Sequence, residues 1–172
     1  MESQSIHSRA EFVTHLALSL FDRTQPLHEL GADSRETLSL AAMVFNHRLP
    51  KGEKKPLKAV HKLIRAELHE QVTAENEEVL AALVSIQHRV IKRKAIDRLD
   101  LSPLQQREAL TLAAILNVAI ALDDSKSQST EIQLVEASKD GMLLVVGGPQ
   151  ALLDAAAAQN SARLWEKIGY PP

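Results

Sequence analysis

Leu110–Ser125, with the sequence LTLAAILNVAIALDDS, is the stretch that decides the fold of this chain. The helix containing it begins at Ser102-Pro103, where a cap residue is followed by proline at the first helical position, and Gln105 completes a capping box. Its second half is apolar on nearly all sides, with Asn117 as its one polar residue. A helix of this kind is typical of the middle of a bundle, where other helices pack on several sides.

The composition favours helices and excludes several kinds of chemistry. The chain has 172 residues, of which 45% are apolar and only 3% aromatic, so the core is expected to consist of aliphatic side chains. No cysteine is present, which excludes thiol catalysis, disulfides and cysteine-ligated zinc. The N-terminus has no apolar signal core, and no uncharged apolar stretch reaches about 18 residues. We therefore expect a soluble, cytoplasmic protein that does not span a membrane.

Hydrophobic periodicity predicts a run of helices in the first 125 residues. The tetrapeptide from Asp33 to Glu36 has the form of a capping box that would open the second helix, and Thr73 is placed to cap the fourth. A short helix within Val90–Leu101 is left open. The predicted helices are Ser5–Phe21, the segment from Asp33 to just before Pro50, Pro56–Leu68, Ala74–His88 and Pro103–Leu122.

The pattern changes after residue 125. Polar and apolar residues alternate over 131–137, an Asp-Gly turn signal follows at Asp140, and the apolar run Met142–Gly147 comes next, which together predict a β-hairpin. Two short helices are expected at Pro149–Gln159 and Ser161–Ile168. The predicted fold is mostly α, with a helical bundle over residues 1–125 and a small α+β annex over residues 126–172 packed on it as a single compact unit.

Positive charge is concentrated in the middle of the chain. Between His47 and Arg98, 12 lysines and arginines face 7 acidic residues, whereas the chain as a whole has a net charge of −2. The first part of this region holds what we call the basic cluster, namely Arg48, Lys51, Lys54, Lys55, Lys58, Lys62 and Arg65. Lys58, Lys62 and Arg65 share one face of a predicted helix. Such a cluster can hold several phosphates through charge-assisted hydrogen bonds, and a solvated helix face is the alternative.

Catalytic and nucleotide-binding motifs are absent from the sequence. There is no phosphate-binding glycine loop, dinucleotide fingerprint, HExxH or GxSxG. Nucleic acid is a less favoured ligand, because the chain is acidic overall and has no aromatic residues among its basic ones. Asp123 and Asp124 could bind a metal or a water molecule, although a solvated helix end is the simpler interpretation.

Several segments occur in an order that resembles one known domain. They are FVTHLALSLFD at 12–22, LSLAAMVFNHR at 38–48, IQHR at Ile86–Arg89 and LAAILNVAIALDDS at 112–125. This order resembles the C-terminal domain of the exopolyphosphatase/guanosine pentaphosphate phosphohydrolase (Ppx/GppA) family, a relative of the HD-type metal phosphohydrolases. The resemblance covers roughly Arg9 to Ile168. It implies an HD-domain-like helical bundle without the nucleotide-fold phosphatase domains of that family.

The resemblance also implies that the HD motif is degenerate. An active site would need a histidine, an adjacent His-Asp pair and a final aspartate to hold metal. These positions fall near Arg9, on Phe45-Asn46 and on Ile120, so we expect no conventional metal centre and no cofactor. His88 and Asp123 remain as weak candidates for catalysis. An unorthodox site for Mg or Mn, needed only by an enzyme, could use His47, His61, His88 and Asp123.

Three functional hypotheses follow. The preferred one is a non-catalytic HD-like module that binds polyphosphate or a phosphorylated nucleotide through the basic cluster, with His88 and Arg89 near the groove. The resemblance implies this role, because the domain is thought to help hold polyphosphate in the family. The first alternative is an exopolyphosphatase-like phosphohydrolase with a rearranged HD site. The second is a regulatory or interaction module, either a homodimer or the partner of a separate phosphatase domain.

Overall fold

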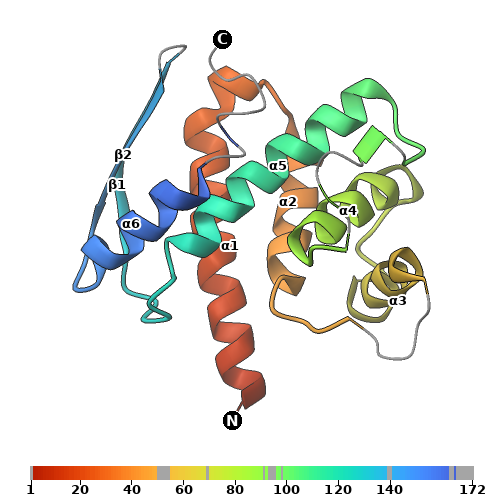
Figure 1. The fold of residues 1–172 in the computed structure, drawn as a ribbon, viewed down its shortest axis with the longest axis horizontal. Helices are drawn as coiled ribbons and strands as arrows, with labels where there is room; N and C mark the ends of the chain where they lie inside the picture. Colours follow the sequence, from red (N-terminus) through yellow and green to blue (C-terminus); the bar gives the residue numbers. More distant parts are fainter. Residues whose placement is uncertain are drawn as a thin grey trace.

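The computed structural model describes residues 2–49, 55–68, 70–90, 92, 96–97, 99–138, 141–162 and 165. In this part of the chain, six helices and one hairpin occur in the order α1 (Glu2–His28), α2 (Ala32–Val44), α3 (Pro56–Leu68), α4 (Ala74–Gln87), α5 (Pro103–Ala121), β1 (Glu131–Ser138), β2 (Gly141–Gly147) and α6 (Ala151–Ser161). The hairpin and α3 lie at opposite ends of the molecule (Figure 1). The mostly α fold with a small hairpin is confirmed.

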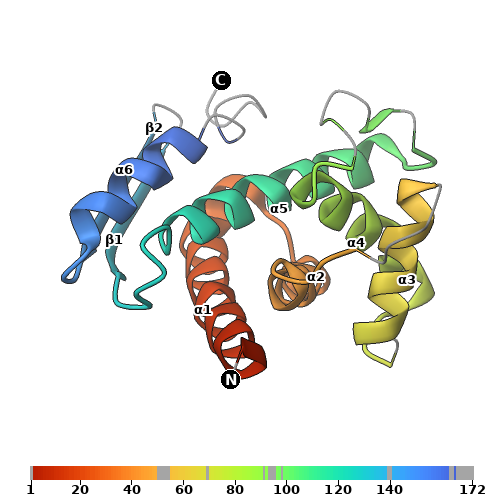
Figure 2. The same ribbon diagram turned by 60° about the horizontal axis from the view of Figure 1, so that its bottom comes forward.

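Helix α5 runs through the middle of the bundle, as the sequence predicts. The Ser102 hydroxyl accepts a hydrogen bond from the Gln105 backbone at 3.2 Å, and the Gln105 side chain accepts one from the Ser102 backbone at 2.9 Å. This reciprocal capping box defines the start of the helix. Helices α1, α2, α4 and α6 all pack against α5 (Figures 1 and 2). In the described part of the chain, no helix is long and apolar enough to cross a membrane.

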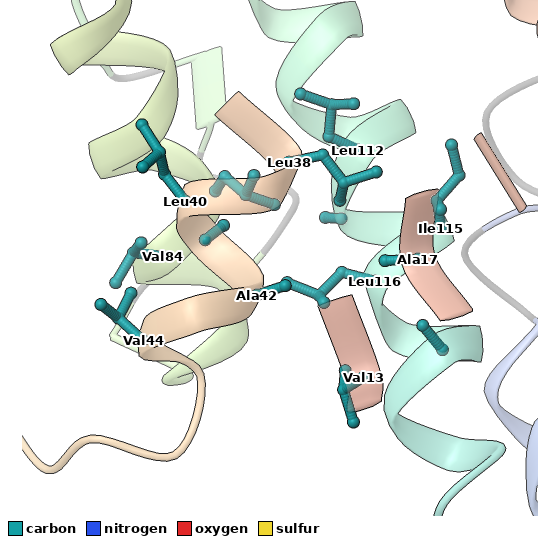
Figure 3. Close-up of a cluster of buried hydrophobic side chains, with 14 of the residues drawn as sticks. Val13, Ala17, Leu38, Leu40, Ala42, Val44, Val84, Leu112, Ile115 and Leu116 are labelled. Atoms are coloured by element: carbon teal, nitrogen blue, oxygen red, sulfur yellow. The ribbon is translucent and has the colours of Figure 1, made fainter. Parts of the chain in front are cut away.

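Aliphatic side chains from four helices form the centre of the core. Figure 3 shows Val13 of α1, Leu38 of α2, Val84 of α4 and Leu116 of α5 in the same buried cluster. None of these four side chains is more than 1% exposed. The side chains labelled in the close-up are aliphatic, and the whole cluster adds only Phe21 and Trp165 as buried aromatic residues in the described part of the chain. The core therefore depends on the fit of branched side chains between helices.

Helix α1 is longer than the predicted Ser5–Phe21, and contacts of the His28 ring stabilise its last two turns. His28 is buried at its C-terminus, where the ring packs 4.4 Å from the Phe21 ring and Nε2 donates to the Phe21 carbonyl at 3.0 Å. Nδ1 accepts from the Leu30 backbone at 3.0 Å. Proline at position 26 is tolerated inside the helix. Glu29, with φ of 56°, then ends it in the left-handed region.

The predicted capping box at Asp33–Glu36 is wrong. Helix α2 begins at Ala32 with Gly31 as its N-cap, and no side chain caps it. Ser34 instead is buried and donates to the Glu108 carboxylate of α5 at 2.6 Å. Asp33 lies inside the first turn of the helix and therefore cannot be its cap, while the Ser34 hydroxyl links α2 to α5.

The hairpin contains a β-bulge that the alternating pattern did not predict. The register shifts between Ile132 and Leu134, so that Ile132 and Val135 both pack on the core although they are three residues apart. Leu134 and its partner Val145 are exposed on the other face. The predicted hairpin is confirmed, whereas Asp140 of its turn lies outside the described residues.

A buried carboxylate connects the C-terminal segment to the bundle. Asp154 of α6 is 0% exposed and accepts hydrogen bonds from the Ser125 backbone at 2.8 Å, the Ser125 hydroxyl at 3.0 Å and the Thr130 hydroxyl. Ala158 and Trp165 belong to the same hydrophobic cluster as α1 and α5. Most of the predicted helix Ser161–Ile168 lies outside the described residues. The hairpin and α6 therefore share one core with the helical bundle.

Leu116→Ala is expected to lower the free energy of unfolding by about 2–5 kcal/mol, because the side chain is fully buried and its removal leaves a cavity. Leu104 lies on the same helix but is 81% exposed. Leu104→Ala, the matched control, is expected to change the free energy by no more than about 0.5 kcal/mol. Urea denaturation measures both values. Equal effects would show that α5 is not the central helix.

The stability of the protein is expected to fall as the pH drops below about 6.5. Burial lowers the pKa of His28, so the folded state binds fewer protons there than the unfolded chain does. The contribution of His28 is therefore complete above the unfolded pKa and is lost as the pH decreases toward the folded one. Urea denaturation between about pH 7.5 and 5 should give a steeper pH dependence for the wild type than for His28→Gln. Identical slopes would contradict this assignment.

Candidate functional site

Helix α3 carries a strip of exposed cations, as its sequence predicts. We define the basic strip as Lys55, Lys58, Lys62 and Arg65, all of which are exposed. The opposite face, represented by Val60 and Ile64, is buried in the core. Because apolar and basic residues alternate with the helical period, burial of one face places the cations together on the other.

The two ends of the basic strip have different electrostatic surroundings. At the C-terminal end, Glu77 of α4 lies 3.7 Å from Arg65 Nε and 3.3 Å from His61 Nδ1. The first turn of α3 contains Lys58 and no acidic residue, and Lys55 directly precedes the helix. Positive charge is therefore concentrated at the N-terminal end of the strip.

The other predicted anion-binding residues do not lie on α3. Arg48 is exposed in the turn after α2. Arg89 is exposed directly after α4, where φ of 57° places it in the left-handed region. Lys51 and Lys54 lie outside the described residues. The predicted anion-binding residues thus come from at least three parts of the chain.

His88 forms a joint between α4 and the turn after α2. Its Nδ1 lies 3.0 Å from the Val84 carbonyl and its Nε2 lies 2.8 Å from the His47 carbonyl. Both ring nitrogens therefore face hydrogen-bond acceptors. A metal ligand needs a free nitrogen lone pair directed at the ion, and this arrangement leaves neither nitrogen in that position.

Asp123 is not at a solvated helix end, so that interpretation of it is wrong. Its side chain is 0% exposed and accepts from Arg9 Nε at 2.9 Å and from the Gln128 backbone at 2.8 Å. Arg9 also donates through Nη2 to the Asp123 carbonyl at 3.1 Å. A buried carboxylate needs such partners, because losing water without compensation is costly. Asp124, the next residue, is exposed as predicted.

The remaining candidate metal ligands have separate surroundings. His47 Nε2 lies 3.6 Å from Glu67, while His61 contacts Glu77. Within the described ranges, no group of three or more histidine, aspartate or glutamate side chains could hold a metal ion. His47, His61, His88 and Asp123 are therefore not brought together as a ligand set.

A pocket of about 490 Å³ lies where α1, α2, α4, α5 and α6 approach one another. Arg9, Phe45 and Ile120, which the resemblance matches to metal-ligand positions, all line it. The Arg9 guanidinium lies 5.3 Å from the centre of the Phe45 ring. Guanidinium, phenyl and aliphatic groups have no lone pair to offer a metal, so these positions form a pocket of different chemistry.

Two features of this region escaped the sequence reasoning. Arg9 was identified only as a departure from a motif, although its positive charge could have suggested a partner for Asp123. Asp154 drew no attention because a lone acidic residue in an alanine-rich helix is normally solvated. Both become visible only when residues distant in sequence lie together.

Arg9→Met is expected to lower the free energy of unfolding by about 3–5 kcal/mol, because it leaves the Asp123 carboxylate buried without its cation. Adding Asp123→Asn should recover part of this loss, because it removes the uncompensated charge. The exposed pair between Arg35 and Asp22, with an Nε–Oδ1 distance of 2.8 Å, gives the control. Arg35→Met should cost no more than about 1 kcal/mol. Urea denaturation distinguishes these outcomes, and a small effect of Arg9→Met would contradict the burial argument.

Comparison with known proteins identifies the family. No curated protein matches the chain. The family model described as Ppx/GppA phosphatase, domain III, matches residues 5–161, which include the bundle, the hairpin and α6. A match over this much of the sequence agrees with the order of the resembling segments. The chain therefore belongs to the Ppx/GppA phosphatase family and corresponds to its domain III.

Proposed function

We propose that this chain is a non-catalytic domain that binds polyphosphate, or another multiply phosphorylated anion, along the basic strip. The observation that carries the proposal is the concentration of lysines at the start of α3, whose first turn contains no acidic residue. The proposal includes the cytoplasmic location expected from the sequence.

Lysines at this place are unfavourable for the helix itself. The N-terminus of an α-helix carries a partial positive charge. An anion in the first turn therefore stabilises the helix by about 0.3–1 kcal/mol, and a cation there destabilises it by a similar amount. Lys55 and Lys58 therefore do not serve the stability of α3. A bound anion would interact favourably with both lysines and with the helix dipole.

The length of the basic strip favours a ligand with several phosphates. Lys55 and Lys62 are separated by seven residues, which corresponds to about 10 Å along a helix axis. A single phosphate cannot contact both ends of such a strip, whereas a chain of phosphates can follow it. Figure 2 shows α3 at the edge of the bundle, packed against α4, which agrees with access for an extended ligand.

The proposal that the domain is non-catalytic rests on the surroundings of His88 and Asp123, the two weak candidates for catalysis. His88 has both ring nitrogens against carbonyl oxygens, and Asp123 is paired with Arg9. Neither side chain is placed to activate a water molecule at the basic strip. Turnover that requires Mg²⁺ or Mn²⁺ would favour the alternative, a phosphohydrolase with a rearranged centre.

Lys58→Glu combined with Lys62→Glu is expected to weaken the binding of medium-chain polyphosphate at least tenfold. A tenfold change in affinity corresponds to about 1.4 kcal/mol of binding free energy, which is less than the contribution of one strong charge-assisted hydrogen bond. Isothermal titration calorimetry at two salt concentrations measures the affinity, which should fall at the higher salt. Arg23→Glu with Lys126→Glu makes the same change in net charge at exposed residues of α1 and of the loop after α5. This control should bind nearly as well as the wild type.

Each result has a clear meaning. Equal weakening in both double variants would show that only net charge matters and would remove the basic strip as a site. Phosphate release in the same samples, dependent on metal, would overturn the non-catalytic role. Neither binding nor release would favour the third hypothesis, an interaction module with a protein partner.

A further inference from the structure

The pocket of about 490 Å³ has a chemistry that the basic strip does not share. Its walls come from α1, α4, α5, α6 and the turns after α2, α4 and α5, and among the described residues none of α3 lines it. Phe45, Ile86 and Ile120 supply apolar walls, and Asn117 supplies an amide. The volume lies within the range of small-molecule sites and is much larger than a single phosphate needs.

The charged groups in this pocket are balanced in sign. Arg9 is neutralised by Asp123, so the charges that remain are the guanidinium of Arg89 and the carboxylate of Asp124. Within the described part of the chain, neither of these two side chains makes a hydrogen bond or an ion pair. The pocket therefore offers one cation and one anion, both available to a ligand.

The backbone of Arg89 adopts a left-handed conformation beside the pocket. The Val90 backbone donates to the Ser85 carbonyl at 2.9 Å and the Arg89 backbone to the Ile86 carbonyl at 3.1 Å, which makes a Schellman motif at the end of α4. Its left-handed position normally belongs to glycine, because a Cβ atom is unfavourable there. Arginine at this position keeps a guanidinium at the pocket at the expense of backbone stability.

The pocket also offers amide groups from two helices. Asn117, the one polar residue in the apolar half of α5, is half-buried and makes no hydrogen bond in the described part of the chain. Gln87 donates through Nε2 to the Ala113 carbonyl at 3.2 Å, and this bond does not use its side-chain oxygen. Polar groups with unused hydrogen-bonding capacity, set beside a few apolar side chains, are typical of sites that orient a small ligand.

We propose that this pocket binds a small zwitterion with an apolar body, of the class of free amino acids and short unblocked peptides. The ligand's carboxylate pairs with Arg89 and its ammonium group with Asp124. Its apolar side chain contacts Phe45 and Ile120, while Asn117 forms hydrogen bonds to it. This site is separate from the basic strip and does not depend on the proposed function.

The direct test is an NMR titration of the full chain with L-leucine, L-isoleucine and L-phenylalanine, and with their unblocked dipeptides. The side-chain resonances of Asn117 and Arg89 report the pocket. We expect saturable chemical-shift changes with a dissociation constant between about 10 μM and 10 mM. Whichever series binds more tightly, the free amino acids or the dipeptides, identifies the class of ligand. The N-acetyl amides of the same amino acids keep the apolar body but lack both charges, so they should bind at least tenfold more weakly.

Two variants of Arg89 separate binding from folding. Arg89→Gln and Arg89→Gly should each weaken zwitterion binding at least tenfold, and Asp124→Asn should do the same. Arg89→Gly should also raise the melting temperature by about 2 °C, because glycine relieves the left-handed strain. Lys58→Glu with Lys62→Glu should leave zwitterion binding unchanged.

Several outcomes would overturn the proposal. They are an absence of saturable shifts, equal binding of the blocked analogues, and unchanged binding in the Arg89 and Asp124 variants. Shifts of the Asn117 and Arg89 resonances by polyphosphate alone would also overturn it, because the pocket would then belong to the anion-binding surface.

Discussion

The pairing of Asp123 with Arg9 is the interaction on which the rest of the structure depends. A carboxylate that is 0% exposed ends the central helix, and it receives two hydrogen bonds, one from α1 and one from the backbone of the following loop. The first fixes the N-terminal half of α1 against α5, and the second directs the chain toward the hairpin. Asp154 of α6 is buried in a similar way, and it accepts hydrogen bonds from Ser125 and Thr130 in the loop between α5 and β1. Two buried acids thus attach the C-terminal segment to the bundle, and each is acceptable only because its partners are complete.

The same pairing shapes the pocket beside it. The ion pair with Asp123 holds the Arg9 guanidinium over the Phe45 ring, so that Arg9 and Phe45 together form one wall of the pocket. Positions that the family resemblance assigns to metal ligands meet there in space, but they carry a cation, a phenyl ring and an aliphatic chain. These three groups offer no lone pair to a metal, so the pocket presents charged, apolar and amide groups instead.

Charge is distributed so that two regions of the surface have different properties. The basic strip on α3 is a row of like charges at the edge of the molecule, suited to an extended polyanion. The pocket has balanced charges, suited to a compact ligand that carries both signs. Helix α4 connects them, since it packs against α3 and the His88 side chain at its C-terminal end contacts the turn after α2.

The sequence by itself determined the order of the helices, the central place of α5, its capping box, the hairpin and the exposed cations of α3. These features follow from local periodicity and from residue types within a few positions of one another. The tertiary structure alone decided that Ser34 bonds to Glu108, that the bulge turns Leu134 outward, and that Asp123 is buried against Arg9. It also decided which candidate residues meet. The rings of His47, His61 and His88 have different partners, while Arg9, Phe45 and Arg89 line one pocket. The physical reason is that these contacts join residues far apart in the chain, and local sequence carries no information about which distant partner satisfies a polar group once water is excluded.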